Sequence, residues 1–161
     1  MFRKLIQTSD DPMLAVLRLA LGVVFFAHGA QKVLGWFGGP GYTGAMEMFT
    51  RHLGIPAVFA VLAILAEFLG GIGLITGFLT RIAALGIAVD MLVAIALVHA
   101  PNGFFMNWNG NKHGEGFEFH ILAIALALFA MVHGAGAFSI DRALELSDHH
   151  RALPHPHPIR G

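Results

Sequence analysis

The stretch PAVFAVLAILAEFLGGIGLITGFL at residues 56–79 decides the fold class. Glu67 is its only charged residue, and the apolar residues run on without the alternation that a strand of a lipid-facing barrel requires. A helix rises about 1.5 Å per residue, so this stretch is long enough to cross a bilayer core of about 30 Å. It therefore predicts a transmembrane helix.

Other parts of the chain have the same character. Three further apolar stretches of similar length are Pro12–Leu34, Ile82–Val98 and Phe117–Phe138. Only a short turn around Thr80 separates the second stretch from the third, which makes those two helices antiparallel neighbours. The sequence thus predicts an all-α fold, an antiparallel bundle of four transmembrane helices over residues 12–140. A cytoplasmic N-terminus (1–11) precedes it, and a flexible cytoplasmic tail (141–161) follows it.

The composition excludes several classes of protein. Hydrophobic residues make up 56% of the chain and charged residues 12%, which is unlike a soluble domain. The formal net charge is zero, so nucleic acid, which requires a clustered basic face, is not an expected partner. The chain has no cysteine, which excludes thiol exchange and thiolate metal sites. Any redox chemistry must therefore use a bound cofactor or a partner.

The distribution of basic residues predicts the orientation. With four helices, both ends of the chain and the turn at Arg81 lie on one side of the membrane. Basic residues are more numerous there than on the other side: Arg3, Lys4, Arg81, Arg142, Arg151 and Arg160 against Lys32, Arg51 and Lys112. Because cytoplasmic segments are enriched in lysine and arginine, we expect both termini to face the cytoplasm, in the cytoplasmic (inner) membrane.

Small and charged residues mark the inward faces of the helices. In the second helix a stripe of small residues is expected to pack against another helix: Ala60, Ala63, Gly70 and Gly73. Glu67 borders this stripe, and Asp90 and Arg18 lie on similar stripes, which predicts a buried ionic layer of these three residues. At least one carboxylate should pair with a cation of the first helix. The layer either fixes helix register or is functional.

A second polar group lies nearer the outer side. His28, Gln31, Lys32 and His120 lie on inward stripes, and we interpret them as candidate ligand-binding residues. Histidine and lysine can donate to the carbonyls of a quinone head group. The alternative is that these side chains contact water at the interface. The pattern assigns no catalytic residue and predicts no metal site.

Four motifs, taken in order, resemble the DoxX family of small four-helix membrane proteins over roughly residues 14–141. The motifs are RLALGVVFFAHGAQK at 18–32, AEFLGG at 66–71, LTRIAA at 79–84 and GAGAFSID at 134–141. The resemblance implies a cytoplasmic-membrane protein. Relatives are associated with membrane oxidoreductase systems, including thiosulfate oxidation coupled to quinone and a complex that links thiol and oxidant defence. It transfers no catalytic residue to this chain.

Three functions remain after these exclusions. The first is a subunit of a quinone-linked membrane oxidoreductase system, with electrons supplied by a partner because no self-contained redox centre is visible. The second is a non-catalytic membrane anchor or assembly subunit for soluble oxidoreductases. The third is small-solute transport as an oligomer. The expected partners are the lipid bilayer and either another protein or further copies of this chain. The sequence alone leaves open whether catalysis occurs in this chain and whether quinone is its cofactor.

Overall fold

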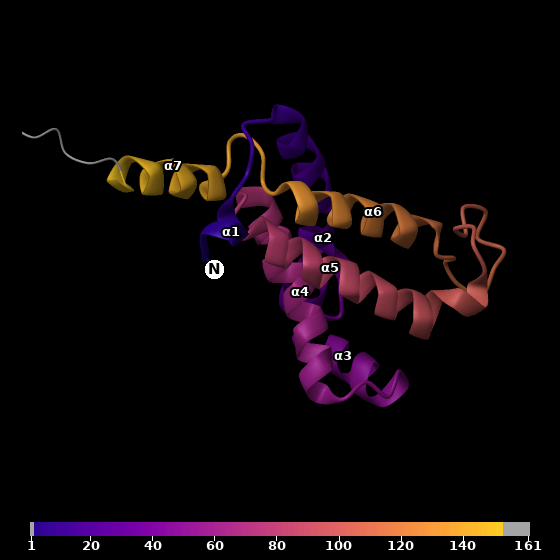
Figure 1. Cartoon of the computed structure of the whole chain (residues 1–161). Helices are drawn as coiled ribbons and strands as arrows, with labels where there is room; N and C mark the ends of the chain where they lie inside the picture. Colours follow the sequence, from indigo (N-terminus) through magenta and orange to yellow (C-terminus); the bar gives the residue numbers. More distant parts are fainter. Residues whose placement is uncertain (1, 153–161) are drawn as a thin grey trace, which may run out of the picture.

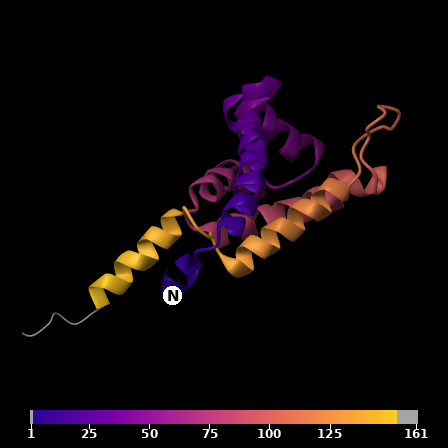
Figure 2. The same cartoon turned by 90° about the horizontal axis from the view of Figure 1, so that it is seen from above.

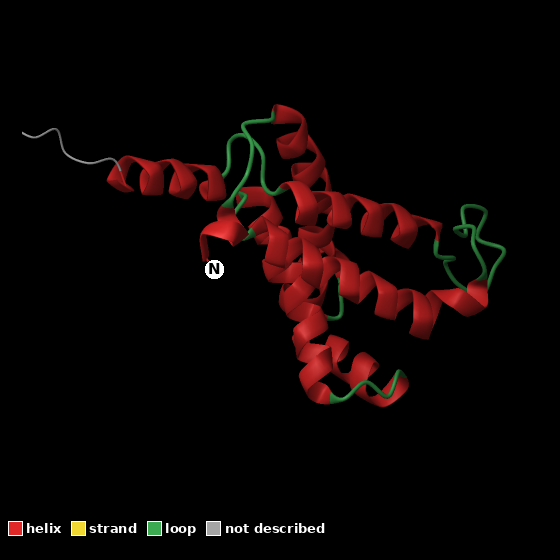
Figure 3. Ribbon diagram, in the orientation of Figure 1, coloured by secondary structure: helices red, strands yellow, loops and turns green. Residues whose placement is uncertain are grey.

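The computed structural model describes residues 2–152, which are helices joined by turns and loops, with no strand among them (Figures 1 and 3). The four long helices are α2 (Pro12–Leu34), α4 (Ala57–Thr76), α5 (Thr80–Ala94) and α6 (Glu118–His133). A π turn at Ile95–His99 and a 3-10 turn at Ala100–Asn102 extend α5. In the described residues, three helical segments are long and apolar enough to cross a membrane, namely Pro12–Leu34, Ala57–Thr76 and Thr80–Asn102; α6 is apolar but shorter.

Short helices lie at the ends and in the first long loop. They are α1 (Phe2–Ile6), the 3-10 turn Trp36–Gly38, α3 (Gly41–Glu47) with the π turn Met48–His52, and α7 (Ile140–Ala152). The sequence did not predict α7, because a tail was expected from residue 141 onwards. The rest of that tail, residues 153–161, lies outside the described residues.

The four long helices form two antiparallel pairs, α2 with α4 and α5 with α6, that diverge from a common end (Figures 1 and 2). We call this the terminal end, since α1, the α4–α5 turn and the start of α7 meet there. The opposite loop end carries α3 and the loop 103–117. The predicted all-α fold is confirmed, whereas the exact antiparallel four-helix bundle is not. A groove lies between α4 and α5.

Glycines bring α2 and α4 into close contact. A Cβ at Gly29 would overlap the main chain of Phe68, and one at Gly71 would overlap the main chain of Phe26. The predicted small-residue stripe faces a different neighbour: Gly70 and Gly73 approach Ala83 of α5. That part of the prediction is confirmed, and α4 therefore presents small residues to helices on two sides.

At the terminal end, Arg18 is 1% exposed and binds main-chain carbonyls. Its Nη1 donates to Leu74 and Ile75 at 2.7 and 2.6 Å, in the last turn of α4. Its Nε donates to Ala135 at 2.7 Å, and its Nη2 to Ala137 and Phe138 at 3.3 and 2.7 Å. The last carbonyls of a helix have no partner within the helix, so this guanidinium both satisfies them and fixes the segment before α7.

Asp141 completes the terminal end from α7. Its two carboxylate oxygens accept from the backbone N–H groups of Leu79 and Thr80, at 2.8 and 3.0 Å, and so cap α5. Asp141 is also the acidic group whose charge acts on Arg18. Arg18 is therefore not part of a layer with Glu67 and Asp90, and the predicted grouping of the three was wrong on this point.

Candidate functional site

Lys32 and Glu67 form a buried ion pair between α2 and α4. The Nζ atom of Lys32 lies 2.5 Å from Oε2 of Glu67, and Glu67 is 6% exposed. Lys32 lies in the last turn of α2, from which its long stem reaches back to the middle of α4. The prediction that a carboxylate pairs with a cation of the first long helix is confirmed, with Lys32 as the cation.

Asp90 of α5 joins this pair. Its side chain interacts electrostatically with both Glu67 and Lys32. We call Lys32, Glu67 and Asp90 the ionic triad. Since each member comes from a different helix, the triad also ties α5 to the α2–α4 pair.

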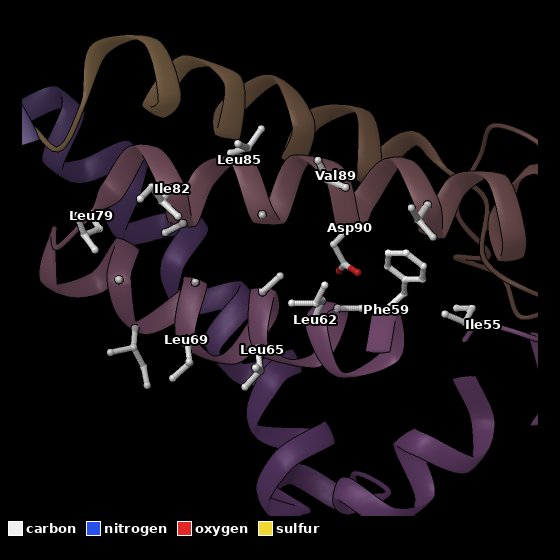
Figure 4. A pocket seen from close by; sticks show the side chains of 18 of the residues that line it. Ile55, Phe59, Leu62, Leu65, Leu69, Leu79, Ile82, Leu85, Val89 and Asp90 are labelled. Atoms are coloured by element: carbon white, nitrogen blue, oxygen red, sulfur yellow. The ribbon is translucent and has the colours of Figure 1, made fainter. Parts of the chain in front are cut away.

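The groove between α4 and α5 has a volume of about 1120 Å³ and leads to the triad. Its walls are apolar, and Asp90 is the one ionisable side chain among the described residues that line it. Figure 4 shows Asp90 pointing from α5 toward α4, close to the labelled side chains of Phe59 and Leu62. A carboxyl group in apolar walls is an arrangement typical of a site for an amphipathic ligand.

Three histidines form a second group, the histidine cluster: His28, His99 and His120. The rings of His99 and His120 are 4.0 Å apart between centroids, and His28 acts on His120 electrostatically. His120 is 6% exposed, and its Nδ1 atom is buried without a hydrogen-bond partner in the described part of the chain. Within residues 2–152, no group of three metal-ligating side chains is arranged to hold a metal ion.

The predicted ligand-binding residues are divided between these two groups. Lys32 belongs to the ionic triad, and His28 and His120 belong to the histidine cluster. His28 is exposed, so its predicted inward placement was wrong. The Nε2 atom of Gln31 lies 3.5 Å from the carbonyl of Phe37, so Gln31 contacts the turn after α2 and joins neither group. Residues four apart face the same side of a helix, so His28 lies one turn from Lys32 and the two groups are adjacent along α2.

His99 was missed by the sequence reasoning, which ended the third helix at Val98. The π turn at Ile95–His99 continues the helix by one more residue and turns His99 toward His120. Its position one residue beyond a predicted helix end, on the same side of the membrane as the start of the helix that carries His120, was the available signal.

Comparison with known proteins identifies the family of this chain. Residues 13–100, more than half of the chain, match the model of the DoxX family. This chain belongs to the DoxX family. The matched region contains Lys32, Glu67 and Asp90, and the match confirms the resemblance seen in the sequence.

Three bacterial proteins are similar in sequence to this chain over most of their length. "Inner membrane protein YqjF" of Escherichia coli is 31% identical over 135 residues, covering 84% of this chain and 94% of that protein. "Uncharacterized membrane protein Rv3486" of Mycobacterium tuberculosis is 32% identical over 150 residues, covering 88% and 86%. "Putative oxidoreductase CatD" of Bacillus subtilis is 26% identical over 126 residues, covering 78% and 82%. No solved structure matches this chain. The chain is thus a DoxX-family membrane protein.

Proposed function

We propose that this chain is the quinone-binding subunit of a membrane oxidoreductase system. The head group lies beside Asp90, and the hydrocarbon chain lies in the groove between α4 and α5. The observation that carries the proposal is the placement of Asp90 as the one ionisable side chain in an apolar groove of about 1120 Å³. A quinone has the matching chemistry, because its ring carries two polar carbonyls and its tail is pure hydrocarbon.

The ionic triad supplies what the reduction of a quinone requires. Reduction to the quinol takes up two electrons and two protons. The Asp90 carboxyl lines the groove, where its protonated form would donate to a carbonyl oxygen of the ring. Lys32, behind Glu67, holds a positive charge close to the ring while negative charge develops on it. Asp90 is then the donor and Lys32 the stabilising cation.

The electrons come from a partner protein with a flavin, thiol or metal centre, since this chain has no cysteine of its own. The name of the Bacillus subtilis relative supports an association with oxidoreductases. We further propose that α6, although it has only 16 residues, forms the fourth transmembrane crossing. The terminal end, which holds Arg81 and Arg142, then faces the cytoplasm.

Substitution of Asp90 by leucine should weaken quinone binding at least tenfold. A hydrogen bond to a charged or ionisable group contributes about 1.5–3 kcal/mol, and 1.4 kcal/mol corresponds to a factor of about ten in affinity. The measurement is a calorimetric titration of decylubiquinone into the protein in phosphatidylcholine nanodiscs. Lys32 and Glu67 remain paired in D90L, so the protein should still fold.

Glu47→Gln is the matched control, because Glu47 is exposed and pairs with Arg51 on the surface of α3, away from the groove. Its affinity should equal that of the wild type. Equal affinities for wild type and D90L would show that the head group does not lie at Asp90. Absence of binding to the wild type would favour an anchor or assembly role instead.

A further inference from the structure

We propose that the histidine cluster is a proton path that joins the surface of the loop 103–117 to the ionic triad. This inference rests on the proposed quinone site, for which it names the route by which protons arrive. The residues follow one another from His99, next to the loop, to His120 and His28, and then to Lys32, Glu67 and Asp90. His99 would thereby be a proton-transfer residue that contacts neither the quinone nor the groove.

The outer part of the path is defined by contacts. The Nδ1 atom of His99 lies 2.8 Å from the carbonyl oxygen of Glu115, an exposed residue of the loop. The ring of His99 lies against that of His120, with the centroids 4.0 Å apart and the planes tilted by 43°. An imidazole can take up a proton on one nitrogen and release one from the other, so adjacent rings can transfer protons in sequence.

The unpaired nitrogen of His120 points to a function rather than to packing. The Nδ1 atom is buried and has no partner among the described residues, which is unfavourable in free energy for a polar atom. The neighbouring inward positions of α6 are alanines, Ala123 and Ala127, which pack there without any polar atom. A nitrogen that binds and releases a proton accounts for a histidine in this place.

The inner part of the path runs along α2. His28 interacts electrostatically with His120 and lies one helical turn before Lys32. Lys32 contacts Glu67, and Glu67 interacts electrostatically with Asp90, which lines the groove. The path requires bridging water between His120, His28 and Lys32. This arrangement connects an exposed loop with the groove by ionisable side chains from α5, α6, α2 and α4.

In the net reaction only the quinone gains protons, and the residues of the path do not. Two electrons from the redox partner, or from an electrode in its place, and two protons convert the quinone into the quinol. For each of the two protons, a histidine gains one proton and passes one on, so that it ends in its initial state. The path therefore controls the rate of reduction and leaves the affinity for the quinone unchanged.

Electrode-driven reduction of bound decylubiquinone tests this path. The protein is held in nanodiscs loaded with one decylubiquinone per chain, and affinity is measured in parallel by calorimetry. For His99→Gln, which retains a hydrogen-bond donor but cannot relay protons, we expect an affinity within twofold of the wild type and a reduction rate at least tenfold lower. Added imidazole should restore most of the rate. The control H133Q changes an exposed histidine at the far end of α6 and should behave as the wild type.

The possible outcomes separate the two proposals. A wild-type rate in H99Q with intact binding would overturn the proton path and leave the quinone site standing. A slow rate that imidazole does not restore would assign a packing role to His99 and would also overturn the path. If the wild type binds no decylubiquinone, the quinone site fails and the path fails with it.

Discussion

Substitution of Arg18 by leucine should remove most of the folded protein from the membrane. Arg18 donates to the carbonyls of Leu74, Ile75, Ala135, Ala137 and Phe138, and leucine would leave all of these without their partner. A buried polar group left unsatisfied is destabilising by about 1–3 kcal/mol, so even partial rearrangement leaves a loss of about 5 kcal/mol. This is comparable with the whole stability of many proteins. The measurement is the yield of monodisperse protein after extraction, together with its Tm.

Two further variants make this prediction specific. Arg18→Lys should recover only part of the stability, because an ammonium group cannot match the planar fork of donors in a guanidinium. Arg51→Leu is the surface control, since Arg51 pairs with Glu47 on the exposed surface. This substitution should change Tm by no more than about 2 °C. Similar losses for R18L and R51L would show that the carbonyl contacts of Arg18 do not hold the terminal end together.

Substitution of Gly29 by alanine should separate α2 from α4 and lower Tm by 10 °C or more. An added Cβ would overlap the main-chain atoms of Phe68, which cannot move without displacing α4. The displacement would also lengthen the Lys32–Glu67 contact, which lies next to this crossing. Overpacking of this kind is destabilising by about 1–3 kcal/mol, and by more where the obstacle is backbone. Thermal unfolding in detergent, followed by circular dichroism, measures the effect.

Gly86→Ala is the matched control for the helix crossing. A Cβ at Gly86 would meet only the Cβ of Ala66, at an ordinary distance of 3.4 Å. Alanine favours a helix over glycine by up to about 1 kcal/mol, so G86A should be as stable as the wild type or slightly more stable. A Tm for G29A equal to that of G86A would mean that α2 and α4 do not pack as closely as described.

The long helices could be predicted from the sequence because their lengths and hydropathy leave few alternatives. The predicted span Pro12–Leu34 has the same bounds in the structure, where Asp11 caps the start and Gly35 ends the helix with φ 71°. The fourth helix was predicted to reach Phe138 but ends at His133, because Gly134 adopts φ 86°. Apolar residues continue past this glycine, so hydropathy alone could not locate the end.

The divergence of the two helix pairs could not be predicted. A small-residue stripe indicates close packing but does not identify the neighbouring helix, and α4 uses Gly71 toward α2 and Gly70 toward α5. The angle between the pairs depends on which of these faces packs more closely. In lipid, an apolar residue outside the helix contacts is about equally stable whichever way it faces. Its position in the sequence therefore does not indicate which helices are neighbours.

The sequence indicated the charged residues inside the helices but not the partners with which they pair. The small-residue stripes suggested Arg18 as a member of one layer with Glu67 and Asp90, whereas the cation that reaches Glu67 is Lys32, through its long stem. The partners of Arg18 are main-chain carbonyls, which every residue has and which leave no mark in a sequence. Charged residues within the spans were thus recognised correctly as interior, while their partners required the structure.

Photoaffinity labelling with an azido-quinone tests most directly whether the groove binds a quinone. The protein in nanodiscs is illuminated with the probe, and the labelled peptides are identified by mass spectrometry, with and without excess decylubiquinone. We expect labels on α4 and α5 at groove residues near Asp90, such as Phe59, Leu62 and Val89, and their loss in the presence of the competitor. Labels confined to other faces of the helices, or labels that the competitor does not reduce, would contradict the quinone site.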